Sequence, residues 1–371
     1  MAVANQEVAV LGAASWVGQE VCRRLVSAGW NVTAVTRPKS ALIVERLPVR
    51  VRKVGDPAVT SRYPVVVNLA FPLDYGAADP RGVNQALKDE ILRLAEPGAR
   101  ILHFSTLAVF GLAVDRPIQV GPVPRWRDHE YAELKREMEH LLAKEFANQE
   151  LHLLRLGNVW GPGSVNWVVG PVSRLRTGQP TAVRGSDGYS NVTDIANVAD
   201  YAAHVLSVPR GRGLHVHHLA EFAERRWSEF IGFLARELGL APVAAPPPPA
   251  LPSGLGAEMW SGTVLAINAA RRAWWDGRQS GSVYRQMRRW VPDAIRHLRP
   301  AKAAEDAGRF RVLDDAPPSD ANLLRLLACP NLFKTAALSD WQPPVDFEAS
   351  IARVSAWLRE AGYVSESGIS V

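Results

Sequence analysis

Short apolar runs alternate with amphipathic stretches along the first 160 residues of the chain. The apolar runs have the length and β-branched content of strands, which we expect at residues 7–11, 31–36, 49–54, 64–70, 100–105 and 151–156. Apolar residues at a helical spacing predict helices at about residues 15–29, 80–96 and 128–147. Strands that alternate with helices are typical of a parallel sheet with helices on both faces. The pattern therefore predicts an α/β fold with a Rossmann-type, doubly wound parallel sheet.

The second half of the chain is divided by a proline run. Residues 241–252 read APVAAPPPPALP, and four consecutive prolines exclude a helix and favour a stiff, extended spacer. An amphipathic stretch at residues 347–360 predicts a closing helix, so we expect a smaller, mostly helical region after the sheet. The expected parts are a Rossmann domain at 1–160, a cleft region interleaved with the last Rossmann strands at 161–245, the spacer and a basic block at 246–305, and the closing part at 306–371.

The composition indicates a folded protein of a reducing compartment. Of the 371 residues, 47% are hydrophobic and 22% are charged, which excludes extensive disorder. The two cysteines, Cys22 and Cys329, form no Cys-x-x-Cys pair, so neither a disulfide framework nor a cysteine-based zinc site is expected. The first residues lack the features of a secretory signal, and no run of about 18 apolar residues predicts a membrane span. We therefore expect a cytoplasmic protein.

The net charge of +6 is concentrated in one segment. Residues 271–302 hold nine Lys and Arg side chains against Asp276 and Asp293, a local balance of +7 that leaves the rest close to neutral. With its tryptophans, the block at 260–302 has the composition of a helix lying in a membrane interface, so peripheral contact with the inner face of the membrane is one expectation. A basic helix that covers a substrate cleft or meets another subunit fits equally well. Nucleic-acid binding is not expected, because no known reading module accompanies the charge.

The first expected strand runs into a glycine-rich turn with the features of a phosphate-binding loop. Gly12 permits a tight turn off the strand, Gly18 permits close packing of helix on strand, and the start of the helix offers free N–H groups to a pyrophosphate. Ser15 replaces the middle glycine of the usual pattern, so an ordinary strand-to-helix turn is the alternative. We expect a dinucleotide to contact Gly12, Ala14, Ser15, Trp16, Val17 and Gly18.

The residue after the second expected strand bears on the choice between NAD(H) and NADP(H). An acidic residue there would accept hydrogen bonds from the ribose hydroxyls of NAD, but this chain has Arg37, with Lys39 close by. A guanidinium cannot accept those bonds, whereas it can pair with a 2′-phosphate. We therefore expect NADP(H) in preference to NAD(H), against the alternative that both are solvated loop cations.

A tyrosine and a lysine lie one turn apart on the helix expected at 128–147. This spacing puts Tyr131 and Lys135 on the same face of the helix. A phenol with a pKa of about 10 is a poor base at neutral pH, but a neighbouring ammonium and the positive charge of an oxidised nicotinamide favour the phenolate. Because many helices contain this spacing by chance, the pair gains its weight from the motifs that precede it.

Several motifs follow one another in a characteristic order. They are Gly12-x-x-Ser15-x-x-Gly18, Gly55-Asp56, Asn68-Leu69-Ala70, the segment ILHFSTLAVFG at 101–111, Tyr131-x-x-x-Lys135, the segment LRLGNVWGPG at 154–163, and a weaker echo LSDWQP at 338–343. With these motifs the chain resembles the extended short-chain dehydrogenase/reductases over about residues 7–220. That superfamily contains nucleotide-sugar epimerases, dehydratases and reductases, and also the 3β-hydroxysteroid dehydrogenases.

The resemblance implies roles for individual residues. Thr106 stands at the position of the catalytic Ser/Thr, which can donate a hydrogen bond to the substrate oxygen where charge develops. Lys135 stands where the family's lysine also holds the nicotinamide ribose, and Asp56 stands where an acidic residue contacts the adenine. Further cofactor contacts are implied for Leu69 and Ala70, and substrate contacts for Phe71, Thr106, Asn158 and Arg184. A homodimer is a further expectation.

The resemblance implies an NAD(P)-dependent oxidoreductase or epimerase that acts on a secondary alcohol or ketone, with a nucleotide- or lipid-linked sugar as the expected substrate. Nucleotide-sugar members commonly carry an arginine just before the segment at 192–199, whereas this chain has Tyr189-Ser190-Asn191. That difference, the Asn197-Val198 pair and the basic block favour an alternative, the oxidation of a polycyclic lipid as by a 3β-hydroxysteroid dehydrogenase. A second alternative is an inactive dinucleotide-sensing protein, which the retained Tyr131 and Lys135 oppose.

Three histidines near residue 215 suggest metal binding at first sight. His215 and His217 would lie on one face of a strand, with His218 on the other. No carboxylate or cysteine is positioned to complete a ligand set. We therefore expect a structural strand and no metal.

Overall fold

The computed structural model describes residues 6–55, 61–71, 80–111, 130–247 and 320–364. Apart from Pro80, these residues belong to one compact unit of the chain. Asp56, the proline-rich spacer beyond residue 247 and the basic block at 260–302 lie outside the described residues. The membrane or subunit contact expected of that block lies outside them too.

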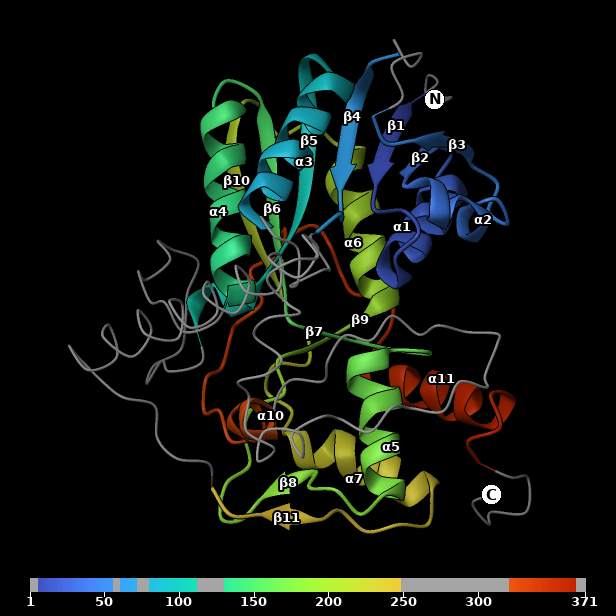
Figure 1. Ribbon diagram of the computed structural model, residues 1–371, viewed down its shortest axis with the longest axis vertical. Coiled ribbons are helices and arrows are strands. Elements are labelled where there is room, and N and C mark those ends of the chain that lie inside the picture. The colour runs from blue at the N-terminus through green and yellow to red at the C-terminus, as the bar shows by residue number, and fades with distance from the viewer. Residues whose placement is uncertain (1–5, 56–60, 72–79, 112–129, 248–319, 365–371) are drawn as a thin grey trace, which may run out of the picture. The chain divides into compact units, whose positions relative to one another are not determined.

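A parallel sheet of seven strands organises the Rossmann part, in the order β10-β6-β5-β4-β1-β2-β3 (Figure 1). From β1 the chain moves outward through β2 and β3, and then, from β4 onward, outward on the other side of β1, which confirms the doubly wound Rossmann type. The strands are β1 (Glu7–Leu11), β2 (Asn31–Thr36), β3 (Arg50–Lys53), β4 (Tyr63–Asn68), β5 (Ala95–Thr106), β6 (Glu150–Leu156) and β10 (Gly213–Leu219).

All six strands expected in the first 160 residues are present, and two of them, β1 and β2, have the expected bounds. The strand expected to reach Ala70 ends at Asn68 instead. The side-chain Oδ1 of Asn68 accepts the backbone N–H of Ala70 at 3.0 Å, which turns the chain out of the ladder. Strand β4 therefore ends in a tight turn at Leu69 and Ala70.

Helices cover both faces of the sheet (Figure 1). Alternate residues of β1 point to opposite faces: Val8 and Val10 join the core with α1 and α6, whereas Ala9 and Leu11 join the core with α3 and α4. The covering helices are α1 (Trp16–Ser27), α3 (Pro80–Leu94), α4 (Glu130–Glu145) and α6 (Ile195–Ser207). Shorter elements are η1 (Pro38–Ser40), α2 (Ala41–Val44) and η2 (Leu107–Phe110). Strands buried from both sides explain the nearly continuous apolar runs in the sequence.

A smaller region, mostly helical, follows the sheet and has a core of its own. We call it the substrate region, after the role expected of it. Trp160 is fully buried at its centre, with its ring centroid 4.9 Å from that of Phe230. The elements are β7 (Asn158–Trp160), η3 (Val165–Val169), α5 (Gly170–Arg176), β8 (Ala182–Val183), β9 (Val192–Asp194), α7 (Trp227–Glu237), β11 (Ala244–Ala245), α10 (Asp320–Leu327) and α11 (Phe347–Glu360). The closing helix expected at 347–360 is α11. None of the described helices has the length and apolar character that a membrane crossing requires.

The first residues of the proline-rich stretch form a strand rather than a free spacer. The carbonyl of Val243 accepts the N–H groups of Thr181 and Ala182 at 2.8 and 3.1 Å, and β11 pairs with β8. An extended backbone with few N–H groups can still accept hydrogen bonds, so proline residues that follow do not prevent this pairing. The chain is thus tied to the substrate region up to Ala245.

The three histidines lie on β10, as expected of a structural strand. His217 accepts or donates hydrogen bonds at both ring nitrogens, to His152 Nδ1 at 2.9 Å and to Tyr201 Oη at 2.8 Å. No group of three or more His, Cys, Asp or Glu side chains within the described part of the chain is arranged to hold a metal ion. His217 instead forms part of a buried hydrogen-bond network beside α6, whereas His215 bonds the carbonyl oxygen of Gly211 at 3.0 Å.

Buried histidines make the stability of the fold depend on pH. Burial lowers the pKa of His217 to about 3 and that of His218 to about 4, far below the usual value of 6.5. Between about pH 4 and about pH 6.5 the two histidines bind more protons in the unfolded chain than in the folded one. Their contribution to the free energy of unfolding is therefore fully present above about pH 6.5 and falls as the pH decreases. Each histidine contributes a slope of up to about 1.4 kcal/mol per pH unit.

Urea unfolding at about pH 7.5 and about pH 5 measures this slope. We expect His218→Gln to reduce the pH dependence, whereas the exposed His140→Gln leaves it unchanged. Equal slopes for the wild type and His218→Gln contradict the prediction.

Candidate active site

The turn between β1 and α1 has the geometry of a phosphate-binding loop although Ser15 replaces a glycine. Ser15 has an ordinary negative φ of −68°, so a side chain causes no strain there. Its Oγ accepts the N–H of Gly18 at 3.0 Å and caps the helix, and its own N–H bonds the carbonyl of Gly12 at 3.0 Å. The serine therefore tightens the turn in a different way from a glycine.

The two flanking glycines are required by close contacts. Gly12 has a φ of +78°, and a Cβ there would lie 2.6 Å from the backbone nitrogen of Ala70. A Cβ at Gly18 would lie 2.3 Å from the carbonyl oxygen of Gly12. The glycines let the turn pack directly on the end of β4, where Leu69 donates its N–H to Leu11 O at 2.9 Å.

The start of α1 fits the pyrophosphate of a dinucleotide. The backbone N–H groups of Trp16 and Val17 make no hydrogen bond to any described residue, and the first turn of the helix carries no acidic residue. Free N–H groups and the positive end of the helix dipole favour an anion at this point. The turn also lies at the carboxyl edge of the sheet, beside the ends of β4 and β2 (Figure 1).

Two cations follow the end of β2. Arg37 and Lys39 are both exposed, and neither makes an ion pair or a side-chain hydrogen bond with another described residue. Their side chains remain available to an anionic group of a ligand. Asp56, expected to contact the adenine, lies outside the described residues.

Thr106 and Tyr131 form a hydrogen-bonded pair. Thr106 is the last residue of β5, and its Oγ1 accepts the backbone N–H of Ala108 at 3.1 Å. The Thr106 hydroxyl also shares a side-chain hydrogen bond with Tyr131, and since this bond lowers the pKa of the phenol, Thr106 acts as its donor. The strand end and the first turn of α4 thus bring together two groups that lie 25 residues apart.

Burial is the main influence on the pKa of Tyr131 in the protein without a bound dinucleotide. It raises the pKa of the phenol above its usual value of 10, while the hydrogen bond from Thr106 acts in the opposite direction. We expected the neighbouring ammonium to favour the phenolate, but the Lys135 Nζ lies 5.9 Å from the centroid of the Tyr131 ring and has its closest partners elsewhere. The positive charge of an oxidised nicotinamide, when bound, would act to lower this pKa.

The side chain of Lys135 is held by the backbone of β5 and by the aromatic ring of Phe71. Its Nζ donates to the carbonyl oxygen of Phe104 at 3.0 Å and lies 4.5 Å from the centroid of the Phe71 ring. The Phe71 ring in turn meets that of Tyr131 edge-on, at 5.1 Å between centroids. Burial lowers the pKa of Lys135 to about 8, and the charge of Glu139 opposes this shift.

A buried ion pair supports α4 one turn beyond Lys135. Glu139 accepts hydrogen bonds from Arg155 Nε at 3.0 Å and from Arg155 Nη2 at 2.7 Å, and Ser105 Oγ also bonds its carboxylate. The guanidinium lies 5.1 Å from the centroid of the Phe110 ring. Sequence reasoning missed this cluster, although an arginine inside the apolar run of β6 and a glutamate four residues after Lys135 were visible signals.

A second buried pair lies under the turn at Ala70. Asn68 Nδ2 and His103 Nδ1 are 3.0 Å apart, on neighbouring strands β4 and β5. Burial and the charge of Lys135 keep the pKa of His103 well below its usual range, so the imidazole is neutral. Asn68 therefore links β5, which ends at Thr106, to the turn at Ala70 that packs on Gly12.

The expected substrate residues are not all brought together. Asn158 lies on β7 and donates its Nδ2 to Ser190 O at 2.6 Å. Asn191, next to Ser190, has a positive φ of 46° and binds Asn331 O at 2.8 Å. Ser190 and Asn191, at the positions where the expected arginine is absent, thus hold β7 and the chain near Asn331 in place.

Arg184 is exposed and follows β8, which lies at the far end of the substrate region from the sheet (Figure 1). Among the described residues, no side-chain hydrogen bond links it to Thr106, Tyr131 or Lys135. The structure therefore gathers Phe71, Thr106, Tyr131 and Lys135, but leaves Arg184 apart.

Comparisons with known proteins identify the family and the fold. The family model described as NAD dependent epimerase/dehydratase family matches residues 8–212. No curated protein sequence matches the chain. Among solved structures, the UDP-glucose 4-epimerase of Thermotoga maritima with UDP-glucose is 14% identical, with a TM-score of 0.56 over 96% of this chain and 99% of that one.

Other similar structures contain dinucleotide. The UDP-glucose 4-epimerase of Bifidobacterium longum, in complex with NAD+ and UDP, is 18% identical, with a TM-score of 0.52 over 75% of this chain and 100% of that one. The UDP-glucuronic acid 4-epimerase of Bacillus cereus, with UDP-glucuronic acid and NAD, is 17% identical, with a TM-score of 0.51 over 65% and 86%. At these identities the likeness shows a shared fold. The family model spans more than half of the chain, so the chain belongs to the NAD-dependent epimerase/dehydratase family. It is therefore an enzyme of the extended short-chain dehydrogenase/reductase type that uses a nicotinamide dinucleotide.

Proposed function

We propose that this enzyme transfers a hydride between a nicotinamide dinucleotide and a secondary alcohol or ketone of a nucleotide-linked sugar. The observation that carries the proposal is the hydrogen bond between Thr106 and Tyr131 beside Lys135, at the edge of the sheet where the glycine turn lies. When bound, the dinucleotide supplies the carbon that accepts or returns the hydride. The proton that accompanies the hydride is handled by the protein.

Tyr131 exchanges this proton with the substrate oxygen. Thr106 donates its hydrogen bond where negative charge develops on that oxygen, and its own orientation comes from the N–H of Ala108. Lys135, held at Phe104 O, orients the ribose beside the tyrosine and adds a positive charge to the site. Phe71 packs against both side chains and fixes their position relative to each other.

A nucleotide-linked sugar is supported by the proteins that share the fold. Three of them bind UDP-glucose, UDP or UDP-glucuronic acid. Ser190 and Asn191, which stand where nucleotide-sugar members commonly carry an arginine, are buried and hold β7 and the chain near Asn331.

Turnover of UDP-sugars tests the proposal. The purified enzyme is incubated with UDP-glucose, UDP-galactose or UDP-glucuronic acid and with NAD+ or NADP+. We expect either a change in nicotinamide absorbance, for net oxidation, or a new sugar in the NMR spectrum without such a change, for epimerisation. Absence of both, together with absence of dinucleotide binding, would overturn the proposal.

The choice of dinucleotide rests on Arg37 and Lys39. We propose that their free charges bind the 2′-phosphate, so that NADP(H) is preferred over NAD(H). Arg37→Ala is expected to weaken NADP+ binding by about 10- to 100-fold, the loss of one charged hydrogen bond, and NAD+ binding by less than about twofold. Titration calorimetry measures both, with the nearby exposed Arg46→Ala as the matched control. Tighter wild-type binding of NAD+ than of NADP+ contradicts this preference.

A further inference from the structure

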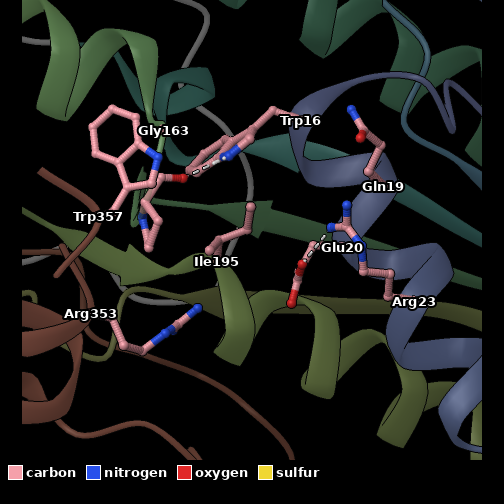
Figure 2. A pocket seen from close by; sticks show the side chains of 9 residues that line it. Trp16, Gln19, Glu20, Arg23, Gly163, Ile195, Arg353 and Trp357 are labelled. Carbon is pink, nitrogen blue, oxygen red and sulfur yellow. Dashed lines mark hydrogen bonds and ion pairs between the residues drawn. The ribbon is translucent and has the colours of Figure 1, made fainter. Parts of the chain in front are cut away.

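The indole of Trp16 joins the glycine-rich turn to the substrate region. Trp16 is the first residue of α1, so its backbone N–H belongs to the group that faces the pyrophosphate. Its side-chain Nε1 donates a hydrogen bond of 3.0 Å to the carbonyl oxygen of Pro162, 146 residues further along the chain. Figure 2 shows this bond as a dashed line across the top of a pocket. A single residue therefore contacts the proposed dinucleotide with its backbone and the substrate region with its side chain.

The carbonyl that receives this bond is held in a rigid turn. Gly161 O accepts the N–H of Ser164 at 3.0 Å, Pro162 occupies the second position, and Gly163 has a φ of +76° in the third. These are the features of a type II turn, whose own hydrogen bond does not use the proline carbonyl. Ser164 Oγ also bonds Val159 O at 3.0 Å, which ties the turn to β7.

Glycines allow the turn to approach the indole closely. A Cβ at Gly161 would lie 3.7 Å from Trp16 Cζ2 and only 2.6 Å from the Ile195 side chain. A Cβ at Gly163 would lie 3.6 Å from Trp16 Nε1. The turn thus packs between the Trp16 indole on α1 and Ile195 at the start of α6.

The turn at 161–164 directly follows β7. β7 ends at Trp160, which is fully buried in the core of the substrate region, and begins at Asn158, whose side chain holds Ser190. β7 thus connects the turn that contains Pro162 directly to Asn158.

We propose that Trp16 is a positioning residue that couples occupancy of the dinucleotide turn to the order of the substrate cleft at β7. The proposal rests on the proposed function, since it requires a dinucleotide on the turn. When the pyrophosphate orders the N–H groups at the start of α1, it also orders the Trp16 side chain. The bond to Pro162 then transmits this order to the turn at 161–164 and to Asn158.

The surroundings of Trp16 make this role testable without loss of the fold. The indole lines an open pocket of about 350 Å³ together with Ile195, Arg353 and Trp357 (Figure 2). Because one side of the ring already faces this space, replacement by phenylalanine leaves no closed cavity in the core. Trp16→Phe keeps an aromatic ring at the start of α1, and it removes the N–H that binds Pro162 together with part of the indole. Trp357→Phe is the matched control, since its indole lines the same pocket and makes no side-chain hydrogen bond among the described residues.

Hydrogen exchange with and without NADP+ or NAD+ measures the coupling in two peptides, residues 12–19 and residues 158–170. In the wild type and in Trp357→Phe, we expect the dinucleotide to slow exchange in both peptides. In Trp16→Phe we expect slowing in 12–19 to remain, and slowing in 158–170 to fall by about fivefold, as for the loss of one hydrogen bond.

The outcomes separate the inference from the function on which it rests. Equal slowing of residues 158–170 in the wild type and Trp16→Phe overturns the role of Trp16, as does the absence of slowing there in the wild type while residues 12–19 are protected. If the dinucleotide protects neither peptide of the wild type, the proposed function fails and the inference fails with it.

Discussion

Tyr131→Phe is expected to lower kcat by about 10²- to 10⁴-fold, the range typical of the loss of a general acid or base. The phenol is the group that the structure places in a hydrogen bond with Thr106, and phenylalanine keeps the ring that packs edge-on against Phe71. The loss should therefore appear in kcat, while the affinity for the dinucleotide changes by less than about threefold, because the ring is not part of the glycine turn. Steady-state kinetics on the substrate found among the UDP-sugars, together with dinucleotide titration, give both values.

A tyrosine elsewhere provides the control for this substitution. The hydroxyl of Tyr63 is buried at the start of β4 and has no hydrogen-bond partner within the described chain, so Tyr63→Phe should leave kcat unchanged. Full turnover by Tyr131→Phe would show that another group exchanges the proton. Loss of activity in both variants would indicate a general effect of the mutations and not of the catalytic hydroxyl.

Glu139→Gln is expected to lower the free energy of unfolding by about 3–5 kcal/mol, the cost of breaking a buried ion pair. Glutamine has nearly the same volume and can still accept a hydrogen bond from Ser105 or Arg155. The guanidinium of Arg155 would nevertheless lose its counter-charge while it remains buried, with its Nη1 already lacking a partner among the described residues. Urea denaturation at neutral pH measures this loss.

Two further variants distinguish the ion pair from a general weakness of α4. Glu137→Gln lies on the same helix and affects only an exposed contact with Arg81, at 3.8 Å, so a change below about 1 kcal/mol is expected. The double replacement Glu139→Leu with Arg155→Met should recover most of the stability, since apolar residues of similar size need no counter-charge. A loss below about 1 kcal/mol in Glu139→Gln would mean that water or another group neutralises Arg155.

The ion pair also has a consequence for catalysis. The charge of Glu139 opposes the effect of burial on Lys135, whose pKa is lowered to about 8. Without that charge the pKa of the lysine falls further, and the fraction of the ammonium form at neutral pH decreases. Glu139 thus stabilises both the position of α4 and the charge of the residue one turn before it.

Much of the fold and of the candidate site could be predicted from the sequence, because the signals are local. The bounds of β1 and β2 and of α11 agree with the apolar pattern, since the alternation of buried and exposed positions repeats within each element. Gly12 and Gly18 were identified for the same reason: a tight turn between a strand and a helix depends on a few neighbouring residues. The spacing of Tyr131 and Lys135 along one helix is likewise independent of the rest of the chain.

Other parts could not be predicted, because they depend on segments far apart in the sequence. The pairing of β7 with β9 joins residues more than 30 positions apart, and each strand is only 3 residues long, too short for a periodic pattern. The location of Arg184 at a distance from the catalytic pair follows from the path of β8, which its neighbours in sequence do not indicate. The meeting of Glu139 with Arg155 likewise required the packing of α4 on β6.

The sequence by itself determined the elements, the dinucleotide turn and the order of Thr106, Tyr131 and Lys135, because hydrophobic periodicity and turn chemistry act over a few residues. The tertiary structure alone decided how those residues ionise and what they touch. Burial, which only the packed fold produces, raises the pKa of Tyr131 and lowers that of Lys135. The bond from Trp16 to Pro162 was equally invisible beforehand, since it spans 146 residues and exists only when α1 packs beside the turn at 161–164.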